Sequence, residues 1–565
     1  MLGQMRLIMT NSQWELFVNR RLFFKVSSLL TGALLSQKVQ AKIQQVFNFK
    51  TKTVKSIDPI QEIDFEDHLN SVDFNGDEIN KGHEILWNVD GYLARKGGIP
   101  QPTQFHSIVI AGGGMSGLLS AYHLLDRNPF IIEQAKSFGG NSKAEKLGLA
   151  KYSIGAAYVT LPDENSDIDL FFKKMNLYKN FKVESDNATQ TKFNTRLVQD
   201  FWKGVTDPVN AEQFIKVELE LRRIYNEAYP DIPWTSDSDI SFQELCRLDK
   251  MTFYDWLKDT FEVLHPHVLE YFQLYCWSSF GGSIQELSAA QVLNFVCAEV
   301  DGVMALPGGN AAIAQAVLEY IQTRLSSEQI TTSSIVIKVQ LQKNGKIWVV
   351  YENPDGQLIT VECDKVICAF PKFVVEKVVE NIPQEKLKAL EKITYRGYIV
   401  SNVILDRPVV SPGFDIFDLK GETLDMPSAM KPPKKLMTDV CFGSWAQNDR
   451  VERSNLTLYR PLPFDGARQF LFNPMSHEKH LKQTQNEVEN FLFELGIDTQ
   501  LVKNYRLTRW GHSLPLAKTS MISDGVVDLI KQPIEDKIYF VNQDNWVNPA
   551  FECCFAESLE VAGLV

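Results

Sequence analysis

The sequence has few cysteines and histidines, and their spacing does not suggest a metal centre. None of the eight cysteines forms a C-x-x-C pair, the spacing that is typical of zinc and dithiol sites. His265 and His267, in a His-Pro-His segment, are more typical of a helix start than of a metal site. We therefore expect no metal and no disulfide framework, with most cysteines reduced in the core.

The sequence also lacks clusters of basic residues after its N-terminal segment. The formal net charge is −12 at pH 7, whereas binding to nucleic-acid phosphates requires clustered Lys and Arg. We therefore expect no nucleic-acid partner. With 565 residues and 44% hydrophobic content, the chain can bury a large core, and its length suggests roughly two to four domains.

The N-terminal region lacks a hydrophobic run long enough to anchor the chain in a membrane. Its uncharged segment, 26–37, is about a dozen residues, and a spanning helix needs ~20. This segment follows Arg20 and Arg21 and precedes Val39-Gln-Ala41, which together resemble a twin-arginine export signal. We predict that residues 1–41 are read by the twin-arginine export machinery, and that the protein is periplasmic or secreted. The alternative is an amphipathic N-terminal helix with a chance Arg-Arg pair.

A glycine-rich segment forms the strongest motif of the chain. The β-branched run 107–111 stops at Gly112, and an apolar helical pattern follows over 118–125. With Gly114 and Gly117, Gly112 completes a G-x-G-x-x-G arrangement between a predicted strand and a predicted helix. The N-terminus of that helix would bind a diphosphate through its free N–H groups and its dipole.

The following segment supports a dinucleotide site. A second apolar run, 129–132, ends at Glu133, about 20 residues after the first glycine, where an acidic residue binds a ribose hydroxyl. The glycine pair Gly139-Gly140 would bring the backbone close to the cofactor a second time. The segment Tyr152-Ser-Ile-Gly-Ala-Ala-Tyr158 follows, and nicotinamide enzymes do not usually carry this pair of features.

Further motifs extend this pattern to the end of the chain. They are the glycine triplet, Glu133, the Gly139-Gly140 pair, Leu306-Pro-Gly-Gly-Asn310, Cys368-Ala-Phe-Pro371 and Ile538-Tyr-Phe-Val-Asn-Gln-Asp544. Together they resemble the flavin-dependent amine oxidase and carotenoid desaturase superfamily from Ser107 to Val565. The resemblance implies an α/β fold with a two-part Rossmann-like FAD-binding domain and an α+β substrate-binding domain.

This resemblance also implies an order of domains along the chain. After the signal we expect an N-terminal arm (42–104), a first FAD-binding segment (105–164), a helical substrate-domain segment (165–300), a second FAD-binding segment (301–385), a second substrate-domain segment (386–505) and a last FAD-binding segment (506–565). Alternation over 334–341, 346–351 and 357–362, with turns at Asn344-Gly345 and Pro354-Asp-Gly356, predicts an antiparallel meander inside the second FAD-binding segment.

The family pattern places the cofactor on particular residues. The implied FAD-binding residues are Gly112, Gly114, Ser116, Gly117, Glu133, Gly139, Gly140, Asn141, Val336 and Asp544. Val336 would meet the adenine through its backbone. No cysteine lies between Trp510 and Tyr539, where covalently flavinylated amine oxidases have theirs, so the FAD is expected to be noncovalent.

Four residues of the C-terminal region are candidates for the wall of the active site. They are Trp510, His512, Trp546 and Phe551, which resemble the groups that the superfamily presents to a substrate beside the flavin. The alternative is that the aromatic residues pack in the core and that His512 is a hydrogen-bonded structural residue. Flavin chemistry itself requires mainly positioning and electrostatics from the protein.

The sequence departs from the family pattern at three places. The strand 395–403 has Ser401 and Asn402 where many amine oxidases carry a lysine, Asn141 replaces a frequent arginine, and Cys553-Cys554 replaces a usual Gly-Ala. Three functions therefore stay open for a small-molecule substrate. One is hydride removal from a C–N bond with oxygen as acceptor, the second is desaturation of an apolar C–C bond with another acceptor, and the third is a non-catalytic flavin-bearing protein.

Overall fold

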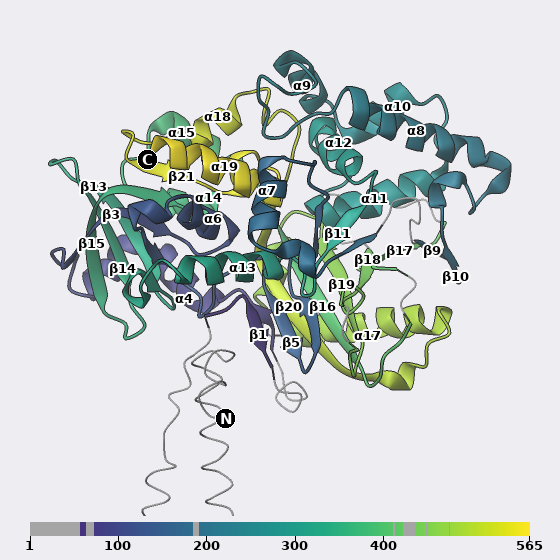
Figure 1. The fold of residues 1–565 in the computed structure, drawn as a ribbon, viewed down its shortest axis with the longest axis horizontal. Helices are drawn as coiled ribbons and strands as arrows, with labels where there is room; N and C mark the ends of the chain where they lie inside the picture. The colour runs from purple at the N-terminus through teal and green to yellow at the C-terminus, as the bar shows by residue number, and fades with distance from the viewer. Residues whose placement is uncertain are drawn as a thin grey trace, which may run out of the picture. The chain divides into compact units, whose positions relative to one another are not determined.

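The computed structural model describes residues 57–63, 73–184, 191–410, 413–421, 435–447, 450–473 and 475–565 (Figure 1). The predicted export signal, 1–41, lies outside these residues. Residues 56–565 form one compact unit. Across the described ranges, no helix combines the length and the apolar character that crossing a membrane requires.

A mainly parallel sheet carries the glycine motif. Its strand order is β12-β4-β3-β15-β14-β13, and β21 pairs with β15. The parallel strands are β3 (Gln104–Ala111), β4 (Phe130–Ile132), β12 (Ile330–Thr331) and β21 (Ile538–Phe540), and the meander is β13 (Ile335–Leu341) and β14 (Ile347–Glu352). β4 is buried along its whole length, as expected for a strand inside a covered parallel sheet.

One long strand, β15 (Leu358–Cys368), joins the meander to the parallel strands. The sequence predicts a strand over 357–362, but the extended backbone continues through Asp364 and Lys365 to Cys368. Its first half pairs antiparallel with β14, while the segment from Val361 onward pairs parallel with β3. Pairing with β3 explains why β15 is one unbroken strand, because Lys365 pairs directly with Ile108 of β3.

A second, larger sheet lies on the substrate side. Its order is β10-β9-β17-β18-β19-β16-β20-β2. The bounds are β10 (Arg196–Val198), β9 (Thr191–Phe193), β17 (Asp415–Leu419), β18 (Asp439–Phe442), β19 (Asn455–Leu462), β16 (Tyr395–Leu405), β20 (Val502–Pro515) and β2 (Asn75–Gly76). The predicted boundary between 386–505 and 506–565 falls inside β20.

A single long helix covers the outer face of this sheet. α17 (Ser476–Glu494) packs Val488, Phe491 and Leu492 against side chains of β16, β18 and β19. Figure 1 shows α17 beside these strands and away from the helices of the 165–300 segment. The opposite face of the sheet is therefore the one available to line a cavity.

The segment 165–300 is mainly helical, as the sequence predicts. Its helices are α7 (Asp167–Lys174), α8 (Ala211–Glu227), α9 (Phe242–Asp249), α10 (Phe253–Thr260), α11 (Pro266–Phe280) and α12 (Ala289–Ala298). Ser241 and Thr252 cap α9 and α10 through backbone N–H groups three residues later. His265 caps α11 by accepting from the His267 N–H, so this pair marks a helix start.

The N-terminal arm packs along both sheets. β1 (Ile60–Glu62) pairs parallel with β5 (Ala144–Leu147), and β2 pairs with β20. α4 (Ile79–Leu86) and α5 (Val89–Arg95) place Ile85 and Leu93 against β13 and β14. The arm is therefore part of the folded unit.

The remaining elements complete the layers around the glycine motif. The strands are β6 (Ala150–Ser153), β7 (Tyr158–Thr160), β8 (Lys182–Glu184) and β11 (Val303–Ala305). The helices are α6 (Met115–His123), α13 (Ala311–Gln322), α14 (Lys372–Val378), α15 (Gln384–Leu390), α16 (Ala467–Leu471), α18 (Val526–Lys531) and α19 (Phe551–Leu564).

Candidate active site

The turn between β3 and α6 has the geometry of a diphosphate cradle. Gly112 has a φ of +114°, and a Cβ at Gly117 would lie 1.9 Å from the Gly112 carbonyl oxygen. Both positions therefore require glycine. No side chain caps α6, whose first turn, including Ser116, follows Gly114 directly. The amides of that turn are available to an anionic ligand.

Glu133 stands at the end of β4 beside this turn. Its carboxylate accepts hydrogen bonds from the Gly113 N–H at 2.6 Å and from the Ala135 N–H at 2.7 Å. Burial raises the pKa of Glu133, while the Lys143 charge and both amides act in the opposite direction. Each carboxylate oxygen retains capacity for another hydrogen bond, so ribose hydroxyls can bind there.

The second glycine pair packs directly on the first motif. The Gly139 N–H donates to the Gly113 carbonyl at 2.9 Å, and Gly139 and Gly140 have φ values of +111° and +58°. The Asn141 side chain leaves this loop and donates to the Ser513 carbonyl at 3.1 Å. Asn141 therefore faces the inside of the protein, where a cavity begins.

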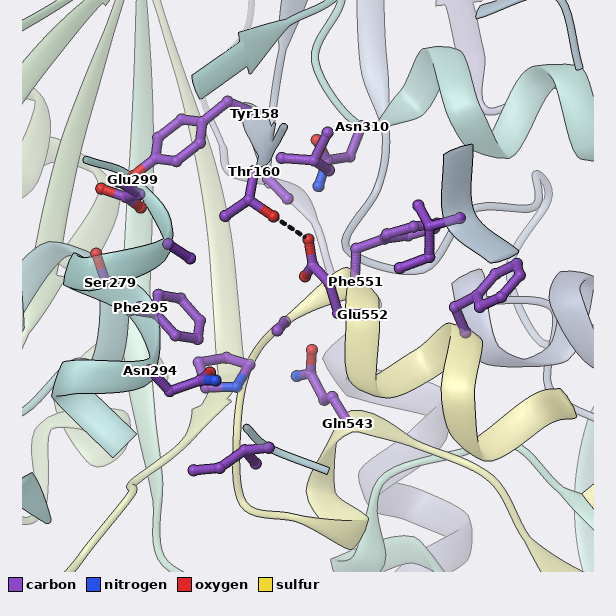
Figure 2. A pocket seen from close by; sticks show the side chains of 18 of the residues that line it. Tyr158, Thr160, Ser279, Asn294, Phe295, Glu299, Asn310, Gln543, Phe551 and Glu552 are labelled. Atoms are coloured by element: carbon purple, nitrogen blue, oxygen red, sulfur yellow. Dashed lines mark hydrogen bonds between the residues drawn. The ribbon is translucent and has the colours of Figure 1, made fainter. Parts of the chain in front are cut away.

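A cavity of about 910 Å³ extends from this loop across the inner face of the larger sheet. Of the predicted residues, Asn141, Trp510 and Phe551 line it. The Trp510 indole N–H donates to the Ile154 carbonyl at 2.7 Å, which fixes its ring. Figure 2 shows Glu552, at the start of α19, projecting toward Thr160, which donates a hydrogen bond to it.

These features fit an FAD molecule. The glycine turn, the uncapped helix and Glu133 suit a diphosphate and a ribose, and the adjoining cavity can enclose a ring system. Asn310, on the wall of that cavity, is 6% exposed, and its Oδ1 has no hydrogen-bond partner among the described residues. A buried polar atom without a partner indicates that a ligand or water satisfies it.

Two of the proposed wall residues lie elsewhere. Trp546 is 4% exposed and packs in the main core, with its indole N–H donating to Glu557 at 2.6 Å. His512 stacks on Phe373 with ring centroids 3.8 Å apart, and burial lowers its pKa to about 3. Neither residue lines the cavity. The surroundings of Trp546 therefore agree better with core packing than with an active-site wall, and those of His512 agree better with a structural role.

Asp544 occupies a buried polar cluster beside the FAD-binding region. Its carboxylate accepts from the Lys372 N–H at 3.0 Å and from the Tyr395 hydroxyl. The strand β21 ends at Phe540, and the Asn542 side chain accepts from the Asp544 N–H to start a short 3-10 turn, Gln543–Asn545. In that turn it is Gln543, rather than Asp544, that lines the cavity.

Two of the three places that depart from the family pattern, Ser401-Asn402 and Cys553-Cys554, are buried, while Asn141 is half-buried. Asn402 donates to the Ser153 carbonyl at 3.0 Å and accepts from Thr457 at 2.7 Å. Cys553 and Cys554 stand at the start of α19, and burial raises the pKa of the Cys554 thiol to about 12. Both thiols are therefore protonated and packed in the core.

Val336 lies in β13, and just before it the Ser334 N–H donates to the Glu133 carbonyl at 2.9 Å.

The charge of the cavity is the feature that sequence reasoning missed. Eight lining residues carry a carboxylate, and no described residue of the lining is a lysine, arginine or histidine. The acidic residues are Asp163, Asp167, Asp231, Asp237, Asp239, Glu299, Asp439 and Glu552. In the sequence, only the close spacing of Asp231, Asp237 and Asp239 could have indicated an acidic cavity. That signal is weak, because an acidic loop on its own usually indicates solubility.

Comparison with known proteins agrees with this site. The sequence profile of the flavin containing amine oxidoreductase family matches residues 115–533, well over half of the chain. Oxidoreductase PigB of Serratia sp. strain ATCC 39006 is 22% identical over 525 residues, which cover 81% of this chain and 75% of that protein.

Solved structures share the fold. Wild-type putrescine oxidase bound to putrescine has a TM-score of 0.59 at 14% identity, covering 82% of this chain and 99% of that chain. Cyclohexylamine oxidase from Brevibacterium oxydans IH-35A has a TM-score of 0.58 at 12% identity, covering 81% and 98%. The chain therefore belongs to the flavin containing amine oxidoreductase family, and it is an FAD-dependent oxidoreductase.

Proposed function

We propose that this enzyme oxidises the C–N bond of a cationic amine and passes the electrons to dioxygen. The charge of the cavity carries this proposal, since eight carboxylates line it without a basic side chain among the described lining residues. A cleft lined by one sign of charge concentrates ligands of the opposite sign. Both structural neighbours are named as oxidases, which supports dioxygen as the acceptor.

The residues of the chain supply binding and orientation. When bound, FAD supplies the two-electron acceptor. Tyr398, Tyr459 and Trp510 offer aromatic faces that exclude water and hold the carbon skeleton of a substrate. Glu552 is fixed by the Thr160 hydroxyl, which donates to it at 2.6 Å (Figure 2), and burial raises its pKa. Such a carboxylate can hold an ammonium group near the aromatic faces.

The cavity also distinguishes the amine from the alternatives. The absence of a lysine in β16, where Asn402 is hydrogen-bonded, favours a desaturase. An apolar substrate, however, would desolvate the buried Asp439 and the half-buried Glu299 and Glu552 without neutralising their charge, which is costly. A non-catalytic role is disfavoured because the family is one of oxidoreductases.

Anaerobic mixing of the FAD-loaded enzyme with primary amines tests this function. We expect amines to bleach the flavin absorbance, and alcohols with the same carbon skeleton to leave it unchanged because they carry no positive charge. Admission of air should restore the absorbance and release hydrogen peroxide. An apolar polyene that bleaches the flavin where no amine does would contradict the proposal.

A further inference from the structure

A short stretch of the N-terminal arm lies against the loops of the FAD-binding region. We call residues 57–63, which include β1, the strap. β1 is the edge strand of the three-stranded sheet β1-β5-β6, and its pairing with β5 begins at Ile60, beside Ala144 (Figure 1). The pairing ends where the Ile63 N–H donates to the Lys146 carbonyl at 3.0 Å. The strap therefore reaches the cofactor region from outside the segment that carries the glycine motif.

The strap holds the backbone on both sides of the Gly139-Gly140 pair. Before the pair, the Phe138 N–H donates to the Ile57 carbonyl at 3.0 Å. After the pair, the Ala144 N–H donates to the Pro59 carbonyl at 3.1 Å. Pro59 is buried, and a Cβ at Gly139 would lie 3.2 Å from the Pro59 Cβ. The loop that carries this glycine pair is thus fixed by the strap at both of its ends.

The strap also reaches the turn that precedes α13. A Cβ at Gly308 would lie 3.9 Å from the Ile60 Cδ1 and 3.1 Å from the Ala144 Cβ. β1 and α13 are in contact. The Gly308 turn belongs to the second FAD-binding segment, whereas Gly139 belongs to the first. One short strand therefore bridges two cofactor-binding loops that are far apart in the sequence.

Both of these loops lead directly into the wall of the cavity. Asn141 lies two residues after Gly139 and lines the cavity. Asn310 lies two residues after Gly308, lines the same cavity, and carries the buried Oδ1 that has no partner among the described residues. Each loop thus contacts the strap at one residue and the ligand cavity two residues later. A movement of the strap would therefore change the spacing of the two loops around a bound cofactor.

The strap can open without unfolding of the core. Pro59 is its one buried residue, and the others are half-buried or exposed. Ile57 packs against the edge of a core cluster that includes Met115 and Leu118 of α6. A strand at a sheet edge, with few buried apolar contacts, opens locally at a lower free energy than the core strands do. The glycine turn, in contrast, is anchored in the covered parallel sheet.

We propose that the strap positions the two FAD-binding loops and retains the cofactor, with Pro59 and Ile60 as its positioning residues. Release of FAD then requires the strap to separate from β5, so that the loops at Gly139 and Gly308 can move apart. Strap opening therefore sets the rate of FAD release. This role is independent of the substrate, because the contacts of the strap involve the cofactor-binding loops.

The rate of FAD release from the full-length, FAD-loaded enzyme tests this proposal. The release is followed by flavin fluorescence after strong dilution. We expect Ile60→Ala, which removes the side chain that reaches the Gly308 turn, to release FAD at least about fivefold faster than the parent. Glu62→Ala, at an exposed residue of the same strand, is the matched control and should release FAD at the parent rate.

A cross-link tests the same proposal in the opposite direction. Ile60→Cys combined with Ala144→Cys places thiols on directly paired residues of β1 and β5, whose Cα atoms, about 5 Å apart, are within reach of a disulfide. The oxidised form of this variant should release FAD several-fold more slowly than its reduced form. Mass spectrometry verifies that the disulfide has formed.

Two results would overturn the proposal. The first is an Ile60→Ala enzyme that melts at a lower temperature than the parent but releases FAD at the parent rate, because the strap would then only stabilise the fold. The second is a cross-linked enzyme that releases FAD as fast as its reduced form. If Ile60→Ala does not fold, the comparison of the oxidised and reduced forms decides the question.

Discussion

Glu133 connects the glycine turn to the strand that ends beside it. Its carboxylate accepts from Gly113 and Ala135 and retains lone pairs for a ribose. We expect Glu133→Ala to lower FAD affinity about tenfold to a hundredfold, because a charge-assisted hydrogen bond of about 1.5–3 kcal/mol is lost. Titration of the apoprotein with FAD measures this. Glu133→Asp should lose part of the affinity for FAD. Unchanged FAD affinity in the alanine variant would show that Glu133 only stabilises the glycine turn and does not bind the cofactor.

Asp439 makes the stability of the substrate-free enzyme depend on pH. Its folded-state pKa of about 6 exceeds its usual value of 3.8, so the folded state binds more protons between these values. Its contribution to stability is therefore present below about pH 4 and is lost as pH rises through 6. Asp439→Asn cannot ionise and should be more stable than the parent near neutral pH, by on the order of 1–3 kcal/mol.

Urea unfolding of parent and variant at several pH values measures this difference. The gap in free energy of unfolding should widen between about pH 4 and about pH 7. A gap that is constant over that range would show that Asp439 is not held neutral by its surroundings.

Trp546 and Phe551 lie close in sequence but have different surroundings. Trp546 is enclosed in the main core and does not line the cavity, while Phe551 lines the cavity and also packs on Phe171 and Phe555 in a second core cluster. We expect Trp546→Ala to cost about 3–5 kcal/mol of stability and to leave flavin reduction normal in the folded fraction. Phe551→Ala serves as the comparison and should weaken amine binding. If the Trp546→Ala enzyme were as stable as the parent but reduced its flavin slowly, Trp546 would belong to the active site after all.

At the level of elements, α6 depends on its close approach to β3. A Cβ at Gly117 would meet the Gly112 carbonyl at 1.9 Å, and neither backbone can yield without opening the turn. We expect Gly117→Ala to abolish FAD binding and to lower the melting temperature. Gly563→Ala in α19 is the matched control, because nothing lies within 4 Å of the added methyl. It should stabilise the protein by up to about 1 kcal/mol.

The short 3-10 turn after β21 shows how one cap changes a site. Asn542 caps the turn through the Asp544 N–H, and the chain leaves the strand well before Asp544. The family resemblance implies that Asp544, at the end of the motif Ile538-Tyr-Phe-Val-Asn-Gln-Asp544, binds the FAD. The cap instead directs Asp544 to Lys372 and Tyr395 and presents Gln543 to the cavity.

At the level of the whole molecule, we propose that the protein is exported in its folded, FAD-loaded form. The proposal depends on Arg20 and Arg21, which lie outside the described residues. Replacing both with Lys should keep the unprocessed protein in the cytoplasm, because twin-arginine machinery reads the guanidinium pair. Fractionation followed by immunoblotting measures this. Periplasmic protein from the double-Lys variant would indicate a general secretory signal, which tolerates the change because charge is retained.

Much of the FAD-binding half could be predicted from local patterns. The strand, turn and helix around Gly112, Gly114 and Gly117 depend on residues within about twenty positions of one another, and glycine spacing reports directly on backbone conformation. The strand ending at Glu133 and the meander with its Asn344-Gly345 turn are local in the same sense. Each was confirmed at the residues that the sequence indicated.

The chemistry of the cavity emerged only when the chain was folded. Glu299, Asp439 and Glu552 stand far apart in the sequence, on a helix end, a strand and the last helix, and no local pattern relates them. Aromatic residues posed the same difficulty, because Trp510 and Trp546 look alike in sequence and differ only in what packs around them. Local spacing therefore decides where a dinucleotide binds, whereas the tertiary structure decides which charges meet its substrate.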